Sequence, residues 1–151
     1  MRILMVCLGN ICRSPLAEGV MQHKADAAGL NWTIDSAGTL DFHKGSAPHH
    51  LSQKVAIENG VDISKQKARP FIAEDFNRFD LIYAMDNLIL AEIKKIAGPL
   101  YDEQKAKLFL EESYPGQYRD LKDPYYGPES GFKEVYEQVS ITCEAILQKH
   151  R

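Results

Sequence analysis

Four short apolar segments recur along the chain and predict the strands of a sheet. Residues 3–6 form an unbroken hydrophobic run, which is typical of a central parallel strand that is covered on both faces. Three further segments have the length and residue types of strands, at residues 32–37, 80–85 and 107–110. Longer segments with hydrophobic residues at helical spacing separate them, so strands and helices are expected to alternate.

End signals locate the helices between these strands. Ser14 is a suitable N-cap and Pro15 a suitable first residue for a helix that ends near Gly29. Asp86 is the expected N-cap of another long helix. The remaining helices are expected at residues 48–59, 73–77 and 131–150. Residues 38–47 and 111–130 lack regular spacing and are expected to be loops, and the length of the second suggests a functional role.

This alternation predicts an α/β fold. Strands that are connected through helices form parallel sheets with right-handed crossovers. We expect a single domain over residues 1–151, with a doubly wound four-stranded parallel sheet in the order 2-1-3-4 and helices on both faces. Ligands bind such sheets at the carboxyl ends of the strands, beside the point where the strand order reverses. Cys7 follows the first strand and is therefore expected at the ligand site.

The composition is that of an ordinary globular protein and narrows the possible partners. Hydrophobic residues make up 44% and charged residues 26% of the 151 residues, and the formal net charge is −3. That charge gives no reason to expect nucleic acid, and no apolar segment approaches a membrane span. The first residues lack the apolar region of a signal peptide, and the three cysteines lack zinc-site spacing. We therefore expect a cytoplasmic protein without a metal or other cofactor.

The residues after the first strand combine an anion-binding loop with a nucleophile. Residues 7–13 have the sequence CLGNICR and end where a helix is expected to begin. A helix start offers unpaired N–H groups and partial positive charge, which together bind anions. Arg13 adds a permanent cation whose planar fork can bind two phosphate oxygens. In this positive field Cys7 is favoured as the thiolate, which is the nucleophilic form.

The same residues carry a resemblance to a known family. Residues 7–18 have the sequence CLGNICRSPLAE, and residues 123–127 have the sequence DPYYG. With matching segments at residues 35–39, 74–76, 79–80 and 85–86, the chain resembles the low-molecular-weight protein tyrosine phosphatases over nearly its full length. The resemblance implies a monomeric, metal-independent enzyme that hydrolyses phosphotyrosine in proteins, and aryl phosphates, through a cysteinyl-phosphate intermediate. Inorganic phosphate would be its product and inhibitor.

The resemblance also implies roles for individual residues. Cys7 would be the nucleophile, Arg13 would bind phosphate, and Asp123 would protonate the leaving group and later activate water. The residues expected to hold the phosphate oxygens through their backbone N–H groups are Leu8, Gly9, Asn10, Ile11, Cys12 and Arg13. Those expected to support this loop are Asn10, Ser14 and Ser36. Those expected to form the walls of the substrate slot are Leu8, Phe42, Tyr125 and Tyr126.

Some neighbouring residues allow more than one interpretation. Cys12 shares a tight loop with Cys7, so it is either a passive small residue or the partner that traps an oxidised Cys7 as a disulfide. Many members of the family have His where this chain has Gln66, which puts a contact behind the loop in doubt. His49 and His50 lack a third metal ligand at suitable spacing and are expected at a solvated helix start.

Other functions share parts of this pattern. Arginine phosphatases of the family carry Thr at the position of Ile11, whereas an apolar Ile11 favours a slot for a flat aromatic ring. A thiol-dependent arsenate reductase needs two further cysteines, and only Cys143, expected in the core, lies beyond Cys12. A non-catalytic phosphate-binding module would need neither Cys7 nor Asp123. A nucleotide-binding module would need a second glycine and a lysine after the first strand, and both are missing.

Overall fold

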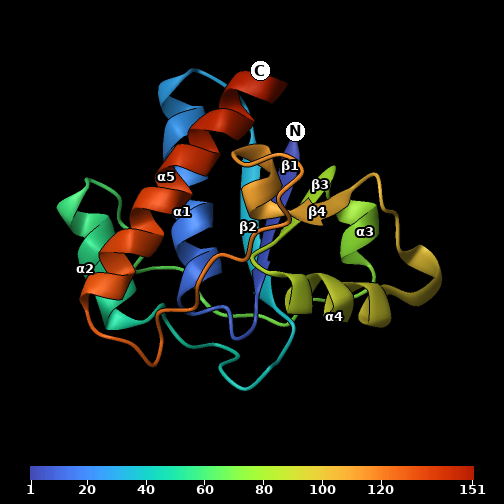
Figure 1. Ribbon diagram of the computed structural model, residues 1–151, viewed down its shortest axis with the longest axis horizontal. Coiled ribbons are helices and arrows are strands. Elements are labelled where there is room, and N and C mark those ends of the chain that lie inside the picture. The colour runs from blue at the N-terminus through green and yellow to red at the C-terminus, as the bar shows by residue number, and fades with distance from the viewer.

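A four-stranded parallel sheet forms the centre of the computed structural model, which describes residues 1–151 (Figure 1). Its strands are β1 (Arg2–Cys7), β2 (Thr33–Gly38), β3 (Leu81–Ala84) and β4 (Ala106–Leu108). They lie in the order β2-β1-β3-β4, and every neighbouring pair is parallel. The predicted fold class and strand order are confirmed.

Helices cover both faces of the sheet. On one face lie α1 (Arg13–Ala27), α2 (His50–Glu58) and α5 (Ser130–His150), which pack against one another (Figure 1). On the other face lie α3 (Asp75–Arg78) and α4 (Asn87–Ala97). Two short 3₁₀ turns, η1 (Gly98–Leu100) and η2 (Phe109–Glu112), follow α4 and β4. The two termini lie together at one end of the molecule, away from the loops that leave the carboxyl ends of β1 and β2.

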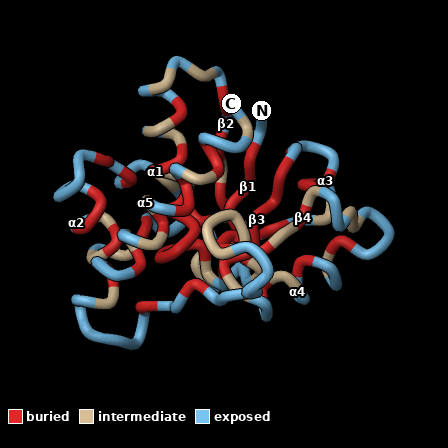
Figure 2. The backbone as a smooth tube through the Cα atoms, turned by 45° about the horizontal axis from the view of Figure 1, so that its top comes forward, coloured by how far each residue is buried: buried red, intermediate tan, exposed pale blue.

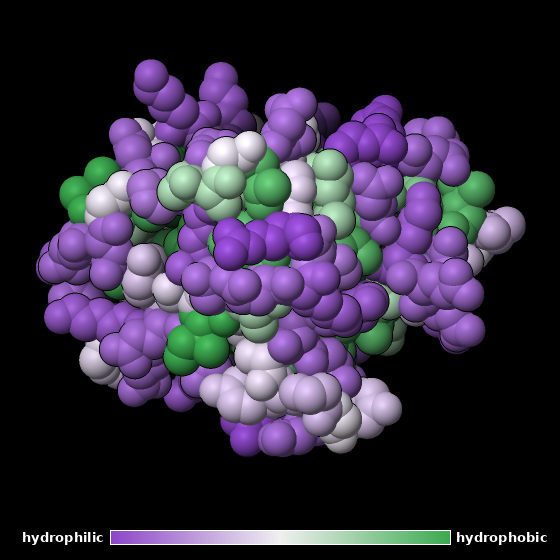
Figure 3. All heavy atoms as spheres, turned by 90° about the horizontal axis from the view of Figure 1, so that it is seen from above, coloured by the Kyte–Doolittle hydropathy of each residue, from purple (hydrophilic) through white to green (hydrophobic).

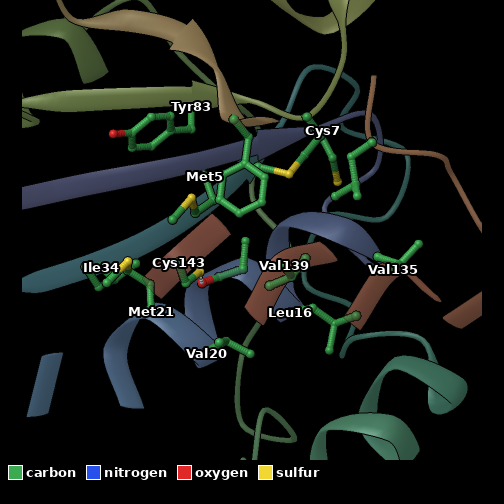
Figure 4. Packing of buried hydrophobic residues seen from close by; sticks show 14 of the residues in the cluster. Met5, Cys7, Leu16, Val20, Met21, Ile34, Tyr83, Val135, Val139 and Cys143 are labelled. Carbon is green, nitrogen blue, oxygen red and sulfur yellow. Dashed lines mark hydrogen bonds between the residues drawn. The ribbon is translucent and has the colours of Figure 1, made fainter. Parts of the chain in front are cut away.

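Each face of the sheet has its own hydrophobic cluster. Successive residues of β1 point to opposite faces, so Met5 belongs to the larger cluster and Leu4 to the smaller one. The larger cluster includes Met5 and Tyr83 of the sheet together with residues of α1 and α5, such as Leu16 and Val139 (Figure 4). Cys143 of α5 is fully buried there, as expected for a core residue. Burial on both faces explains the unbroken apolar run of β1, whose backbone crosses the buried centre of the molecule (Figure 2).

Ser14 does not cap α1, contrary to the sequence prediction. The helix begins one residue earlier, at Arg13, and its N-cap is Cys12, whose side chain makes no capping hydrogen bond. The Ser14 hydroxyl is instead buried and hydrogen-bonded to the side chains of Cys7 and Asn10. Hydrogen bonds to two side chains of the preceding loop have therefore replaced the local cap that the sequence suggests.

The predicted strand at residues 107–110 is wrong beyond Leu108. The chain turns into η2 at Phe109, and both Phe109 and Leu110 are buried in the larger cluster. A short apolar run has the same appearance in a buried strand and in a buried turn, so spacing alone could not separate them. The other strand and helix ends differ from the predictions by a few residues, as is usual for such boundaries.

Two helix starts show clear side-chain caps. Asp86 caps α4 as predicted, because its Oδ1 accepts a hydrogen bond from the backbone N–H of Ile89 at 2.8 Å. At α2 the cap is His49, whose ring Nδ1 accepts from the N–H of Leu51 at 3.1 Å. The helix therefore begins slightly later than the predicted start near residue 48, and His49 is half-buried, not solvated as expected.

The end of β2 lies against the loop that follows β1. A side chain at Gly38 would place its Cβ 2.8 Å from the carbonyl oxygen of Leu8 and 3.0 Å from the amide of Asn10. Only glycine permits this approach of two backbones. The opposite end, which carries both termini, is mainly hydrophilic with scattered hydrophobic residues (Figure 3). None of the helices combines the length and hydropathy needed to span a membrane.

Candidate active site

The loop at residues 7–13, here called the anion loop, connects β1 to α1 and depends on Asn10. Asn10 has a φ of 57°, in the left-handed region that asparagine tolerates better than most residues. Its Nδ2 donates to the hydroxyls of Ser14 and Ser36, both at 2.9 Å, and its Oδ1 accepts from the backbone N–H of Arg69 at 3.1 Å. The buried amide thus connects the loop to α1, to β2 and to the segment after α2.

The nucleophile candidate receives a hydrogen bond from this network. The Sγ of Cys7 lies 2.9 Å from the Oγ of Ser14. Because Asn10 donates to Ser14, the Ser14 hydroxyl proton is available for the sulfur. Such donation favours negative charge on the acceptor. The structure therefore places Asn10, Ser14 and Ser36, the three predicted support residues, in one network behind Cys7.

The network ends at Glu18, a residue to which the sequence analysis assigned no role. Ser36 donates its hydroxyl to Glu18 Oε1 at 2.6 Å. Burial, assisted by the charge of Asp35, raises the pKa of Glu18 from 4.5 to about 7, although the Ser36 hydrogen bond and Arg69 act in the opposite direction. Glu18 lies four residues after Ser14 in α1, so the two face the same side of the helix. That spacing is the sequence signal that could have identified it.

Gln66, where many family members have His, forms a side-chain hydrogen bond with α1 and none with the anion loop. Its Nε2 donates to the carbonyl oxygen of Pro15 at 3.2 Å, and its buried Oε1 has no hydrogen-bond partner. Gln66 and Glu18 line the same hollow beside α1. A neutral amide therefore stands near Glu18 at the position where a histidine could carry a positive charge.

Arg13 is a buried cation that is held by its surroundings. Its Nη1 donates to Asp86 Oδ2 at 2.7 Å and to the carbonyl oxygen of Leu121 at 2.8 Å. Burial opposes the charge, but Cys7 and Asp86 raise the pKa of Arg13 above its ordinary value. Its Nη2 lies 3.7 Å from Asp123 Oδ2. Asp86 was predicted from the sequence only as a helix cap, and its ion pair with Arg13, which holds one edge of the guanidinium in place, was not predicted.

Asp123 belongs to a loop at residues 121–127, here called the acid loop, that meets the anion loop across Arg13. The backbone N–H of Leu121 donates to Met85 at the end of β3 at 2.8 Å, which fixes the beginning of the acid loop. Asp123 Oδ1 accepts from the backbone N–H of Tyr125 at 3.1 Å, so Oδ2 is the oxygen that faces Arg13. The Asp123 side chain is 40% exposed, compared with 3% for Arg13.

A pocket of about 230 Å³ opens between the two loops. Cys7, Arg13 and Asp123 all line it. Its other predicted lining residues are Leu8, Gly9, Ile11, Cys12, Phe42, Tyr125 and Tyr126, and the two that were missed are Leu40 and His43. Phe42 and Tyr126 remain 84% and 95% exposed, so they form an open rim around the mouth. Cys7, Cys12 and Arg13 are almost fully buried.

This arrangement places a cysteine sulfur, a guanidinium and a carboxyl group around one pocket at the carboxyl end of the central strand. The comparisons with known proteins agree with that chemistry. The family model for the low molecular weight phosphotyrosine protein phosphatases matches residues 2–151. The chain belongs to this family.

Relatives and solved structures match the phosphatase chain along its whole length. A low molecular weight phosphotyrosine protein phosphatase of Schizosaccharomyces pombe is 41% identical over 150 residues, covering 97% of this chain and 95% of the relative. The crystal structure of a protein tyrosine phosphatase from Entamoeba histolytica superposes with a TM-score of 0.91 at 36% identity, covering 99% and 96%. A Drosophila arginine phosphatase superposes with a TM-score of 0.92 at 32% identity, covering 100% and 98%.

Replacement of Glu18 by Gln should change how the stability of this phosphatase depends on pH. Because folding raises the pKa of Glu18 from 4.5 to about 7, the folded chain holds a proton that the unfolded chain has released in this interval. Glu18 therefore lowers the free energy of unfolding of the wild type as the pH rises through this interval, whereas the amide of Glu18→Gln does not titrate. The free energy of unfolding of Glu18→Gln relative to wild type should increase by up to about 3 kcal/mol between pH 5 and pH 8, measured by urea titration.

Glu111→Gln provides the control for this measurement. Backbone hydrogen bonds from Gly116 and Tyr118 lower the pKa of Glu111 below its ordinary value, so it stays ionised throughout this range. The stability difference between Glu111→Gln and wild type should therefore be the same at pH 5 and pH 8. An equally constant difference for Glu18→Gln would show that Glu18 does not titrate within this interval.

Proposed function

We propose that this chain is a metal-independent phosphotyrosine protein phosphatase in which Cys7, Arg13 and Asp123 act directly on the substrate. The observation that carries the proposal is that all three side chains line one pocket, with a hydrogen bond from Ser14 on the Cys7 sulfur. The names of the relatives and the family model support the same activity. A non-catalytic phosphate-binding module would need neither the sulfur nor the exposed carboxylate.

In the first step the Cys7 thiolate attacks the phosphorus atom in line with the departing phenol oxygen. A phosphorus–sulfur bond forms as the phosphorus–oxygen bond breaks, and Asp123 transfers its proton to the phenol oxygen. The anion-loop amides and the free edge of Arg13 hold the three remaining phosphate oxygens, where negative charge spreads in the transition state. The contacts of Arg13 Nη1 with Asp86 and Leu121 leave its Nη2 and Nε for this purpose.

In the second step water hydrolyses the cysteinyl phosphate. Asp123, now ionised, takes a proton from the attacking water while the phosphorus–sulfur bond breaks and the Cys7 thiolate is restored. Inorganic phosphate is released from the anion loop. Because phosphate fits the same amides and the same guanidinium as the substrate, we propose that it is also a competitive inhibitor.

Cys7→Ser tests the assignment of the nucleophile. Turnover of p-nitrophenyl phosphate should be abolished, because only the thiolate attacks, whereas inorganic phosphate should still bind through Arg13 and the loop amides. Steady-state kinetics and calorimetric titration with phosphate, each with and without a chelator, measure the two properties. Cys143→Ala, in the core away from the pocket, should keep its activity. Turnover within tenfold of wild type in Cys7→Ser would remove this cysteine from the mechanism.

We propose that the substrate is phosphotyrosine in preference to phosphoarginine or phosphoserine. The likeness to a Drosophila arginine phosphatase shows that the fold alone does not separate these activities. Ile11 is 9% exposed and lines the pocket together with Leu8, so the region next to Cys7 offers apolar surface to an aromatic ring. Phosphoserine is too short to bring its phosphate to the anion loop beneath the aromatic rim.

Phosphopeptides that differ only in the modified residue measure this preference. The value of kcat/KM for phosphotyrosine should exceed those for phosphoarginine and phosphoserine by at least about tenfold, or roughly 1.4 kcal/mol of transition-state binding. Ile11→Thr should narrow the difference between phosphotyrosine and phosphoarginine. Faster hydrolysis of phosphoarginine by the wild type would refute both the preference and the role of Ile11.

We also propose that Cys12 protects Cys7 from irreversible oxidation. Peroxide converts the Cys7 thiolate to a sulfenic acid, and the Cys12 thiol then displaces water from that sulfur to form a disulfide. Burial, with the neighbouring Cys7, raises the pKa of Cys12 to about 12, so Cys12 remains a thiol. The two sulfurs are therefore not equivalent, and oxidation is expected to begin at Cys7.

Recovery after peroxide treatment tests this protection. Wild-type protein should regain most of its activity with dithiothreitol, whereas Cys12→Ser should regain much less, because its sulfenic acid proceeds to the irreversible sulfinic acid. The activity of both forms before and after reduction is the measurement. Equal recovery would make Cys12 a bystander.

Compartment, assembly and domain organisation complete the proposal. We propose a cytoplasmic monomer with one phosphatase domain over residues 1–151. Three free, buried cysteines are consistent with a reducing compartment. A single sheet with helices from the whole chain supports the one-domain organisation.

A further inference from the structure

His49 lies between the two loops that carry the proposed chemistry. Its backbone N–H donates to the carbonyl oxygen of Ile11 in the anion loop at 2.8 Å. Its ring caps α2, because Nδ1 accepts from the N–H of Leu51 at 3.1 Å. One residue thus fixes the start of a helix and contacts the anion loop through separate groups.

The His49 ring also packs against the acid loop. Its centroid lies 5.7 Å from that of Tyr125, at an interplanar angle of 75°, which is an edge-to-face contact. On α5 the ring of Phe132 stacks with His49 at 5.0 Å and 27°. The exposed His50 stacks with it at 4.5 Å and 20°. Buried Phe132 is a rigid support, so the position of His49 is fixed where Tyr125 rests on it.

Tyr125 connects this ring contact to the proposed acid. Its backbone N–H donates to Asp123 Oδ1, which leaves Oδ2 toward the pocket. On the other side of Asp123 the acid loop is fixed at Leu121. Between Asp123 and Tyr125, buried Pro124 lies near Gly131 of α5. The orientation of the carboxylate therefore depends on where the Tyr125 peptide lies.

We propose that His49 is a positioning residue for the general acid: its ring holds Tyr125, so that the Tyr125 N–H orients Asp123 toward the leaving-group oxygen. The inference rests on the proposed role of Asp123. An N-cap alone needs no ring, because asparagine, aspartate and serine cap helices at least as well. The aromatic contacts of His49 are what a smaller cap could not supply.

Two substitutions separate the ring of His49 from its capping function. His49→Asn keeps an acceptor for the Leu51 N–H and the backbone donor to Ile11, but it removes the ring. His49→Phe keeps a ring for Tyr125 and Phe132, but it removes the acceptor. His49→Asn should therefore keep the wild-type denaturation midpoint but lose the orientation of Asp123. His49→Phe should have a lower denaturation midpoint but keep the orientation of Asp123.

A series of aryl phosphates with leaving groups of increasing basicity detects the direction of the acid. A basic phenolate needs a proton in order to leave, whereas a nitrophenolate departs unaided. For His49→Asn, kcat/KM should fall about tenfold with phenyl phosphate and less than about twofold with 2,4-dinitrophenyl phosphate, a part of the roughly 10²–10⁴-fold that general acid catalysis supplies. His49→Phe should show the wild-type dependence on the leaving group.

His50→Asn is the matched control, since the same change one residue later removes an exposed ring that stacks on His49 but makes no ring contact with Tyr125. It should leave the leaving-group dependence unchanged. In an Asp123→Asn background, His49→Asn should add no further selective loss, because the residue it positions has gone.

The outcomes distinguish this inference from the proposed function. Asp123→Asn alone should lose far more activity with basic leaving groups than with acidic ones. A uniform loss in Asp123→Asn would overturn the role of Asp123 and this inference with it. Two results would overturn the role of His49 alone, provided that Asp123→Asn shows a loss selective for basic leaving groups. One is a uniform loss of activity in His49→Asn, and the other is a loss selective for basic leaving groups in His49→Phe.

Discussion

The buried charge of Arg13 is the constraint on which the arrangement of the site depends. A cation with 3% of its side chain exposed requires partners, and these come from two separate segments: Asp86 at the start of α4, and the acid loop, which contributes the Leu121 carbonyl and Asp123. Asp86 serves twice, because its other oxygen caps α4. Satisfying one guanidinium therefore aligns the ends of two strands with the acid loop, and it leaves one edge of Arg13 facing the pocket.

A second network uses neutral groups and supports the sulfur from behind. Asn10, in its left-handed conformation, donates to both serines. Each serine can then donate its own hydroxyl proton, Ser14 to Cys7 and Ser36 to Glu18. The donor direction along the network therefore follows from the two acceptors at the ends of the network, the Cys7 sulfur and the Glu18 carboxyl group. Each side chain of this network has at least one hydrogen-bond partner, so the network supports the conformation of the anion loop.

The sequence was informative where a function or an element depends on neighbouring residues. Hydrophobic spacing located all four strands, and residues 7–13 indicated the anion loop because its parts are consecutive. Contacts between distant segments were missed, such as Arg13 with Asp86 and His49 with Tyr125, since no local pattern records them. At Ser14 the local sequence and the folded structure disagree. Its sequence context favours a helix cap, whereas its hydroxyl is hydrogen-bonded to Cys7, seven residues away.

The side chains of the pocket fall into two groups by solvent exposure: the buried residues proposed to act on phosphate, and the exposed residues of the rim, which can be substituted more freely. Arg13 and Cys7 are 3% exposed and are held by several hydrogen bonds, so substitutions there disturb buried partners. Phe42 and Tyr126 are more than four-fifths exposed at the rim, where a change costs little stability. This division allows a phosphatase of tyrosine and one of arginine to share the fold. We propose that discrimination between their substrates resides at positions such as Ile11, which is 9% exposed and lines the pocket.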